Sequence, residues 1–270
     1  MDIKAIVDRY LLELQHRNQA TVCQLRRIAA YFTLDLDVTP ERAMNYVISR
    51  RPIVKPSTLN REITIMKQLF KWMLVRGYID KDPSVGIKYE SGVAKRVRHI
   101  TIEEEVRLTL ECPVWLQPII QFATSTGMRR GEIVSLLKSD VNLDDKTATI
   151  RTSKNGEPRV IPLTRRALNA VAATVSCGDR LFGGKNGGKI VMSNLEYNVR
   201  SAAIRARIDD LHFHDLRHTA ASRWIQSGID LYVIQMLLGH KSPTMTTRYA
   251  HHNISSLRKA ITMTETNNEH

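Results

Sequence analysis

Apolar residues recur at the spacing of an α-helix over most of this chain, and one short segment breaks the pattern. At the amino end, Ile3, Ile6, Val7 and Tyr10 fall on a single helical face. The exception is residues 147–163, where two strand-like runs, TATIRT and RVIPL, flank Asn155-Gly156. Asn-Gly between such runs favours a two-residue hairpin turn. The sequence therefore predicts a mainly α-helical fold with a small β-sheet.

Start and stop signals divide residues 1–90 into four predicted helices. The first contains Ile3–Leu14, the second follows Thr21, the third is opened by Thr39-Pro40, and the fourth runs from Ser57 or Thr58 to Gly77. Residues 82–99 lose helical periodicity and contain the basic residues Lys95, Arg96 and Arg98. We therefore expect a helical domain at 1–85, a basic linker at 86–99 and a second domain at 100–270.

The second domain is predicted to mix helices with the hairpin. Thr101 and Glu104 form a capping box that opens a helix ending before Pro113. Residues 114–126 are nearly free of charge, which indicates a buried helix ended by Gly127. Further helices are expected from Met128 to Leu137, after Thr164, and from a second capping box, Ser193 and Glu196, to about Arg207. The fold class expected for residues 100–270 is thus mixed α+β.

The composition points to a polyanionic partner. The chain has 270 residues, 43% of them hydrophobic, and a formal net charge of +13, which favours nucleic acid over a membrane surface. Its three cysteines, Cys23, Cys112 and Cys177, form no CxxC pair, so a disulfide framework or a zinc finger is not expected. No signal peptide and no apolar run of ~18 residues is present, and we expect a cytoplasmic, nucleoid-associated protein without a membrane partner.

Residues 212–252 concentrate histidine, arginine and tyrosine on three predicted helices. The first helix, 215–227, ends at Gly228; Asp230 caps the second, 231–238; and Ser242-Pro243 opens the third. His214 and Arg217 have the i, i+3 spacing that places two side chains on one helical face. This clustering makes the stretch the first candidate for a reactive site.

Charged residues at the ends of predicted elements suit the chemistry of a phosphodiester. Arginines such as Arg129 and Arg217 offer permanently charged forks for the non-bridging oxygens of a transition state. A tyrosine such as Tyr249 can attack phosphorus and form a covalent intermediate, and a lysine on a mobile hairpin, Lys154, can protonate the leaving oxygen. Because the arginines supply the electrostatic stabilisation, this chemistry requires neither a metal nor another cofactor.

The spacing of these residues resembles a known family. TGMRRGEIVSLLKSDV at 126–141 is similar to the first motif of the tyrosine recombinase (phage integrase) family. HDLRH at 214–218, LGH at 238–240 and Tyr249 are similar to its second. The resemblance covers the catalytic domain, here 100–265. Residues 1–90 resemble the SAM-like core-binding domain of the family by position and pattern more than by motif.

The resemblance implies a role for each candidate residue. Arg129 and Arg217 would clamp the scissile phosphate, and Lys154 would protonate the leaving 5′ oxygen. His214 would assist proton transfer, and His240 would hydrogen-bond the phosphate. Tyr249 would form the 3′-phosphotyrosyl link. Glu132 would be structural and would hold the helix of the first arginine.

The resemblance also implies the partners. Family members cut and rejoin double-stranded DNA at a specific recombination site, as a homotetramer and through a Holliday junction. The tail after Tyr249 would pack on a neighbouring subunit, and accessory DNA-bending or directionality proteins are compatible with this function. Basic residues of the helical domain and the linker are further candidates for DNA contact: Arg26, Arg27, Lys67, Lys95, Arg96 and Arg98.

Three other functions fit parts of the same sequence. A type IB topoisomerase would share the tyrosine chemistry but relax DNA without a specific site. A non-catalytic DNA-binding protein could use Ala220–Leu238 as a helix-turn-helix, although this leaves Arg129, Lys154 and Tyr249 without a role. A metallohydrolase could use His214 and His218, an imperfect match to HExxH, with His240 or His251 as a third ligand. Only this last alternative predicts loss of activity with a chelator.

Two assignments depend on the motif spacing. Arg130 adjoins Arg129, and the TGxR spacing selects Arg129. Tyr197 and Tyr232 are rival nucleophiles, but neither has the late helical position of Tyr249.

Overall fold

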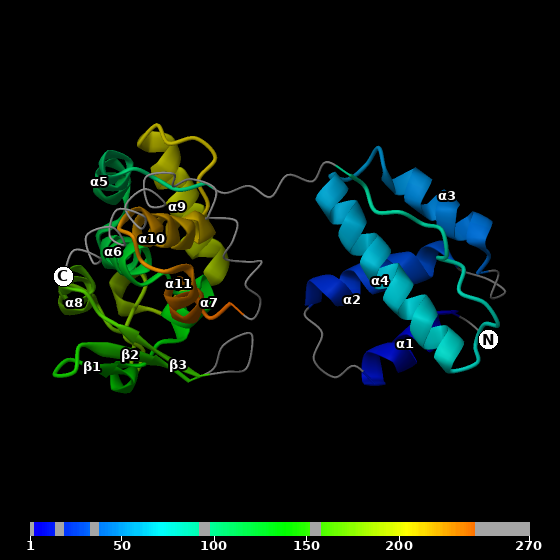
Figure 1. Ribbon diagram of the computed structural model, residues 1–270, viewed down its shortest axis with the longest axis horizontal. Coiled ribbons are helices and arrows are strands. Elements are labelled where there is room, and N and C mark those ends of the chain that lie inside the picture. The colour runs from blue at the N-terminus through cyan, green and yellow to red at the C-terminus, as the bar shows by residue number, and fades with distance from the viewer. Residues whose placement is uncertain (1–2, 14–18, 33–37, 92–97, 152–157, 241–270) are drawn as a thin grey trace, which may run out of the picture. The chain divides into compact units, whose positions relative to one another are not determined.

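The computed structural model describes residues 3–13, 19–32, 38–91, 98–151 and 158–240. The chain divides into two compact units, residues 1–95 and 96–270, and each is described by itself. The division falls within residues 86–99, the predicted linker. Figure 1 shows the helices of the first unit in blue to cyan and the elements of the second in green to orange.

The described part of the first unit is helical. It contains α1 (Ile3–Glu13), α2 (Gln19–Tyr31), α3 (Pro40–Arg50) and α4 (Pro56–Val75). The long helix α4 packs against each of the other three, and its buried face carries Leu59, Ile63, Met66, Leu69, Phe70 and Met73. Burial of this apolar face, at about 25 cal/mol per Å², supplies most of the stability of such a bundle.

The capping signals located the start of one of these helices accurately and the starts of two others less so. Thr39 caps α3 and accepts a hydrogen bond from the Arg42 backbone N–H, as predicted. The predicted start of α2 after Thr21 is wrong, because α2 begins at Gln19. The predicted start of α4 at Ser57 or Thr58 is also wrong: Pro56 takes the first helical position, where its missing N–H costs nothing.

The second unit surrounds a buried central helix. Its helices are α5 (Ile102–Glu111), α6 (Gln117–Thr126), α7 (Arg130–Ser135), α8 (Arg165–Ala172), α9 (Met192–Arg205), α10 (Phe213–Gln226) and α11 (Leu231–Leu238). Helix α6 contacts α5, α8 and α10, and nearly all of its side chains are buried, as its lack of charge predicted. The 3₁₀ turns η1 (Val114–Leu116), η2 (Lys138–Asp140) and η3 (Lys185–Gly187) complete the described helical elements.

The small sheet is antiparallel. It contains β1 (Val141–Asn142), β2 (Thr147–Ile150) and β3 (Arg159–Pro162) in the order β1-β2-β3, and β2 pairs with β3 from Thr147↔Pro162 to Ile150↔Arg159. The two longer strands were predicted, whereas β1 is too short to give a periodic signal. The Asn155-Gly156 turn lies outside the described residues. A mainly α-helical fold with a small sheet is therefore confirmed.

The predicted capping box at Ser193 and Glu196 is wrong. Val191 is the N-cap of α9, it has no side-chain capping hydrogen bond, and the helix begins at Met192. The Glu196 side chain instead accepts from Arg130 (2.7 Å) and contacts the His212 ring nitrogen (3.3 Å). A capping box requires only two residue types at one spacing, so tertiary partners can claim the carboxylate. Within the described residues, no helix is both long and apolar enough to cross a membrane.

Candidate active site

The amino-terminal turn of α10 presents two of the candidate residues. The Asp215 carboxylate accepts a hydrogen bond from the His212 backbone N–H (2.8 Å) and so fixes the start of the helix. His214 is exposed, whereas Arg217, one turn later, is only 3% exposed. The His214 ring also meets the buried His218 ring edge to face, with centroids 4.9 Å apart. Helix α10 therefore offers an exposed imidazole beside a buried guanidinium.

The Arg217 guanidinium joins two helix ends. It donates to the carbonyl oxygens of Gly127 (2.8 Å), which ends α6, and of Leu238 (2.6 Å), the last residue of α11. Gly127 adopts the left-handed conformation (φ +60°), and a Cβ there would lie 2.9 Å from a Leu238 methyl. Glycine suits this position because its φ is positive and because a side chain here would force the Leu238 methyl to shift.

Arg129 stands immediately before α7. Its guanidinium donates to the Glu132 carboxylate (2.9 Å) and to the Gly239 carbonyl (2.8 Å), and its side chain is 20% exposed. Glu132 also accepts from the Arg129 backbone N–H (2.8 Å). The side chain and backbone of Arg129 are thus both held by one carboxylate, the structural role predicted for Glu132.

Arg130 points to different partners. Its guanidinium donates to Glu196 on α9 (2.7 Å) and its side chain is 38% exposed. Arg129 therefore contacts the same α11 terminus as Arg217, whereas Arg130 contacts α9.

The structure adds a third arginine that the sequence did not single out. Arg159, the first residue of β3, donates two hydrogen bonds to Glu132 (3.0 and 2.7 Å) and one to the Leu237 carbonyl (3.1 Å). The strand pattern located Arg159 but gave no indication of its partners. One signal was available in the sequence: Arg159 begins an apolar strand. A charged side chain at such a position needs a counter-ion if it is buried.

The three arginines meet at one turn, residues 237–240, which we call the arginine-capped turn. The carbonyls of Leu237, Leu238 and Gly239 accept hydrogen bonds from Arg159, Arg217 and Arg129 respectively. Carbonyls at a helix C-terminus have no partner within the helix and carry the negative end of its dipole, so cations are favoured there. The half-buried His240 ends the turn, and its carbonyl accepts from the Gln235 side-chain amide (3.1 Å). The turn therefore places His240 next to two of the candidate arginines.

The electrostatics of this cluster keep Glu132 ionised. Burial acts to raise the pKa of the Glu132 carboxyl. Hydrogen bonds from the Arg159 side chain and the Arg129 backbone, the positive charge of Arg159 and a hydrogen bond from the Arg129 side chain outweigh burial and hold the pKa below its ordinary value. At neutral pH the ionised Glu132 partly neutralises two guanidinium groups that bind the same carboxylate. Glu132 thereby reduces the repulsion between Arg129 and Arg159 and fixes both side chains, while one net positive charge remains on the three groups.

Several predicted site residues lie outside the described residues: Lys154, Tyr249, Lys95 and Arg96. The helix predicted at Ser242-Pro243 and the metal-ligand alternative His251 do so as well. Among the residues that are described, no group of three or more His, Cys, Asp or Glu could hold a metal ion.

The described DNA-contact candidates differ in their surroundings. Arg26 is exposed. Arg27 pairs with the buried Glu62 (3.2 Å), the Lys67 ammonium donates to the Ile87 carbonyl (2.6 Å), and Arg98 pairs with Glu104 (2.9 Å). Arg27, Lys67 and Arg98 therefore already bind groups within the chain, and a DNA phosphate would have to share or replace these contacts.

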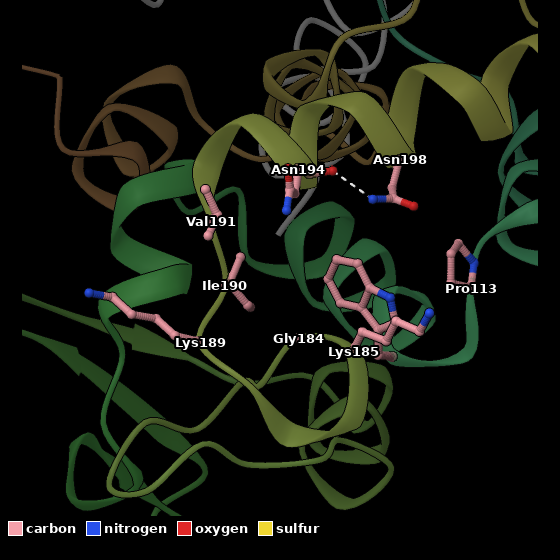
Figure 2. A pocket seen from close by; sticks show the side chains of 9 residues that line it. Pro113, Gly184, Lys185, Lys189, Ile190, Val191, Asn194 and Asn198 are labelled. Carbon is pink, nitrogen blue, oxygen red and sulfur yellow. Dashed lines mark hydrogen bonds between the residues drawn. The ribbon is translucent and has the colours of Figure 1, made fainter.

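The candidate residues do not line the cavity drawn in Figure 2. That cavity, of about 410 Å³, is bordered by Trp115, Lys185, Lys189, Asn194 and neighbouring residues from the segments around η1, η3 and the start of α9. Arg129, Arg217 and His214 are not among them. The described candidate residues Arg129, Arg217 and His240 lie instead around the ends of α6, α7 and α11.

Comparison with known proteins identifies the family. The sequence profile of the phage integrase family matches residues 98–255. The chain is a member of this family of tyrosine recombinases. It is 30% identical over 253 residues to a shufflon-specific DNA recombinase of Escherichia coli, covering 91% of this chain and 62% of that protein. It is 31% identical over 227 residues to the integrase of Salmonella phage P22, covering 74% of this chain and 56% of that protein.

Solved structures of integrases share the fold of this family member. The Tn1549 transposon integrase in complex with circular intermediate DNA superposes with a TM-score of 0.79 at 16% identity, covering 97% of this chain and 99% of that one. A lambda integrase dimer bound to a core site superposes with a TM-score of 0.78 at 19% identity, covering 94% and 97%. At such identities the superpositions establish the architecture alone.

Proposed function

We propose that this phage integrase family member is a site-specific DNA recombinase. It cleaves and rejoins strands of double-stranded DNA through a covalent 3′-phosphotyrosyl intermediate and a Holliday junction, and so carries out integration, excision or a related rearrangement. The chain spans about three fifths of the length of the shufflon-specific recombinase that it matches. The proposal therefore depends on the candidate site of this chain.

The convergence of Arg129 and Arg217 carries the proposal. One guanidinium comes from the residue that precedes α7 and the other from α10, and they donate to the adjacent carbonyls of Gly239 and Leu238, immediately before His240. Each guanidinium is a planar, permanently charged group with five N–H donors, the geometry that suits the oxygens of a phosphate. Two such groups at one turn, with His240 beside them, suit a phosphate bound there.

The proposed chemistry follows from the groups assembled there. The Tyr249 hydroxyl gives its proton to His214 and its oxygen attacks phosphorus, forming a 3′-phosphotyrosyl bond as the bond to the 5′ oxygen breaks. Lys154 gives its proton to that leaving oxygen. Arg129, Arg217 and His240 stabilise the negative charge that accumulates on the non-bridging oxygens. Attack by the 5′ hydroxyl of a partner strand reverses these steps and restores a phosphodiester.

The proposed partner is double-stranded DNA carrying a recombination site, bound by four copies of the chain. A tetramer of lambda integrase bound to a Holliday junction has the same fold, with a TM-score of 0.76, which supports this assembly. The net charge of +13 favours DNA and, with it, association with the nucleoid. Accessory DNA-bending or directionality proteins remain compatible with this assembly.

A covalent-trapping experiment tests the function. Nicked duplexes covering the DNA on either side of the gene are incubated with the full chain. A nick just downstream of the cleavage position lets the short fragment that carries the released 5′ hydroxyl diffuse away, which prevents rejoining. We expect a protein–DNA adduct that survives denaturant and forms equally with EDTA present. Tyr249→Phe should form none, whereas Tyr197→Phe and Tyr232→Phe, which alter exposed tyrosines, should form as much as the wild type. An adduct from Tyr249→Phe, or a requirement for metal, would overturn the proposal.

The leaving-group assignment has its own test. Lys154→Ala should slow cleavage of ordinary DNA, and a 5′-bridging phosphorothiolate should restore the rate because a thiolate leaves without a proton. A Lys154→Ala variant that stays equally slow on the phosphorothiolate would remove Lys154 from the acid role.

A further inference from the structure

Arg159 is bound through all three of its guanidinium nitrogens. Nε donates to the Leu237 carbonyl, and Nη1 and Nη2 donate to the two oxygens of Glu132. The side chain is only 11% exposed, and that of Glu132 only 5%. This geometry differs from that of a residue placed to receive a phosphate, because its fork is already filled by a carboxylate.

The contacts of Arg159 lead to two different parts of the candidate site. Through Glu132 it reaches Arg129, whose backbone N–H and guanidinium bind the same carboxylate. Through Leu237 it reaches the arginine-capped turn. Arg217 and Arg129 also donate hydrogen bonds to this turn, and His240 is its last residue. The guanidinium additionally packs on Gly239: a Cβ at that position would lie 3.0 Å from Nη1 and 3.1 Å from Cζ.

The position of Arg159 in the chain adds a third connection. It is the first residue of β3, pairs with Ile150 of β2, and closely follows the segment that contains Lys154. The base of the hairpin is therefore fixed to the same carboxylate as Arg129. One guanidinium links the strand that follows Lys154, the residue that precedes α7, and the C-terminus of α11.

We propose that Arg159 is a positioning residue for DNA strand cleavage, which holds Arg129 and the arginine-capped turn in register with the base of the hairpin. The inference rests on the proposed function and assigns to Arg159 the role of positioning other groups, because its own guanidinium is bound by Glu132 and Leu237. Arg159 acts by fixing the positions of the Arg129 guanidinium and the His240 ring. Displacement of catalytic groups by about 1 Å can lower a rate by about 100-fold.

A lysine at position 159 is the most informative substitution. It keeps the positive charge beside Glu132 but has a single nitrogen, which cannot bind both carboxylate oxygens and the Leu237 carbonyl together. Single-turnover cleavage by Arg159→Lys should therefore fall about 100-fold, while its affinity for the same DNA changes little. Arg159→Gln, which retains one N–H₂ donor, serves as a second variant in case the lysine variant does not fold.

A neutral substrate separates positioning from general damage to the fold. Replacing one non-bridging oxygen of the scissile phosphate by methyl removes a negative charge, so cleavage depends less on the exact placement of the arginines. The loss caused by Arg159→Lys should shrink from about 100-fold on phosphate to a few-fold on the methylphosphonate. Arg129→Ala should show the same pattern.

Arg166→Lys is the matched control. Arg166 binds both oxygens of another buried carboxylate, Glu105, but contacts no part of the arginine-capped turn. This variant should lower the midpoint of thermal unfolding and lose no more activity on phosphate than on methylphosphonate, when assayed at a temperature where circular dichroism shows it folded.

The outcomes are distinguishable. If the wild type forms no adduct on any flanking DNA, the proposed function fails and the role of Arg159 falls with it. If the wild type cleaves and a folded Arg159→Lys cleaves as fast, the inference alone is overturned. Equal losses on phosphate and methylphosphonate would also overturn it, because they would give Arg159 no part in placing charge.

Discussion

Two buried glutamates of the second unit, Glu105 and Glu132, have the same chemistry and different surroundings. Glu105 is 1% exposed and accepts hydrogen bonds from Arg166 and Arg223; Glu132 is 6% exposed and accepts them from Arg129 and Arg159. Each is a carboxylate shared by two arginines that are distant from each other in the sequence. They differ in what the other donors of those arginines contact.

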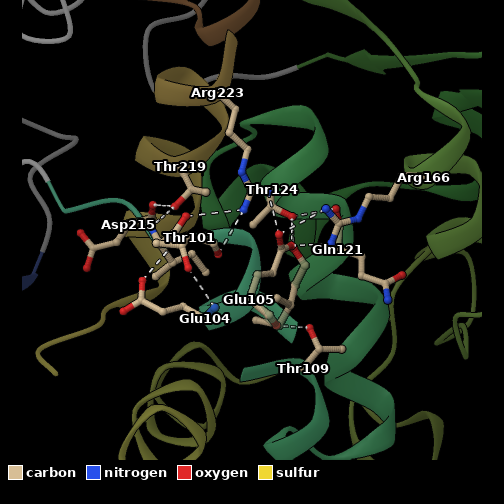
Figure 3. A network of polar contacts seen from close by, with 12 residues as sticks. Thr101, Glu104, Glu105, Thr109, Gln121, Thr124, Arg166, Asp215, Thr219 and Arg223 are labelled. Atoms are coloured by element: carbon tan, nitrogen blue, oxygen red, sulfur yellow. Dashed lines mark hydrogen bonds and ion pairs between the residues drawn. The ribbon is translucent and has the colours of Figure 1, made fainter. Parts of the chain in front are cut away.

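The arginines of Glu105 join elements of the scaffold. Figure 3 shows Arg166 and Arg223 approaching Glu105 from α8 and α10, together with Thr124 of α6. Arg223 also reaches the carbonyls of Ile100 and Thr101, where the chain enters α5. The Glu105 cluster therefore connects α5, α6, α8 and α10 with the residues that precede α5. The hydrogen bonds of its arginines go to groups that hold these helices together.

The arginines of Glu132 instead extend to the carbonyls of the arginine-capped turn. The same ion-pair chemistry thus serves the scaffold in one place and the candidate site in the other. We expect substitutions in the first cluster to change mainly stability, and those in the second to change mainly the rate of cleavage.

The largest expected change in stability follows Glu105→Gln. This substitution removes the charge that compensates Arg166 and Arg223 and leaves two partly buried guanidinium groups without it. We expect the free energy of unfolding to fall by about 3–5 kcal/mol, measured by denaturant titration. The control Glu111→Gln removes a carboxylate from a half-exposed pair with Arg205 and should cost about 0–1 kcal/mol. Equal effects of the two variants would show that burial of Glu105 adds nothing.

Two glycines test whether the arginine-capped turn has a catalytic role. Gly239 (φ +62°) and Gly228 (φ +82°) both adopt the left-handed conformation, so alanine at either should cost about 1–2 kcal/mol of stability. A Cβ at 239 would also displace Arg159, whereas a Cβ at 228 meets nothing within 4 Å. Gly239→Ala should therefore slow single-turnover cleavage at least tenfold more than Gly228→Ala. Equal cleavage rates would show that the turn tolerates movement.

The pH dependence of stability gives a smaller effect with a definite sign. The pKa of the Glu132 carboxyl is lowered in the folded chain, so its contribution is fully present above the ordinary pKa of 4.5 and is lost as pH falls through the folded value. The difference in unfolding free energy between wild type and Glu132→Gln should be largest at neutral pH and shrink in acid, because protonated Glu132 is then as neutral as glutamine. A difference that stays constant below pH 4.5 would contradict the ionised state of Glu132.

The sequence predicted local structure better than it predicted the candidate site. Thr39, Thr101 and Asp230 each cap a helix as predicted, because a cap depends on a few adjacent residues, and Thr164 caps the helix that was predicted to follow it. The resemblance to the family proposed Arg129, Arg217 and His240, but no periodic pattern indicates which carbonyl a guanidinium will find. The Arg129 contact with Gly239 spans 110 residues of sequence and exists only after α7 and α11 have packed. Arg159 was missed for the same reason, since neither Glu132 nor Leu237 is near it in sequence.

The smallest expected effects come from the N-caps at the starts of α5 and α11. Thr101 caps the helix that carries Glu105, and Asp230 caps α11, whose other end is the arginine-capped turn. Thr101→Ala and Asp230→Ala should each lower the free energy of unfolding by about 1 kcal/mol. Because three arginines hold the far end of α11, Asp230→Ala should cleave within about twofold of Thr101→Ala in single-turnover assays. If Asp230→Ala instead slows cleavage as much as Arg159→Lys does, then the first turn of α11 positions the helix. The contacts of the arginines with the carbonyls of the arginine-capped turn would then not explain why the Glu132 cluster affects cleavage and the Glu105 cluster does not.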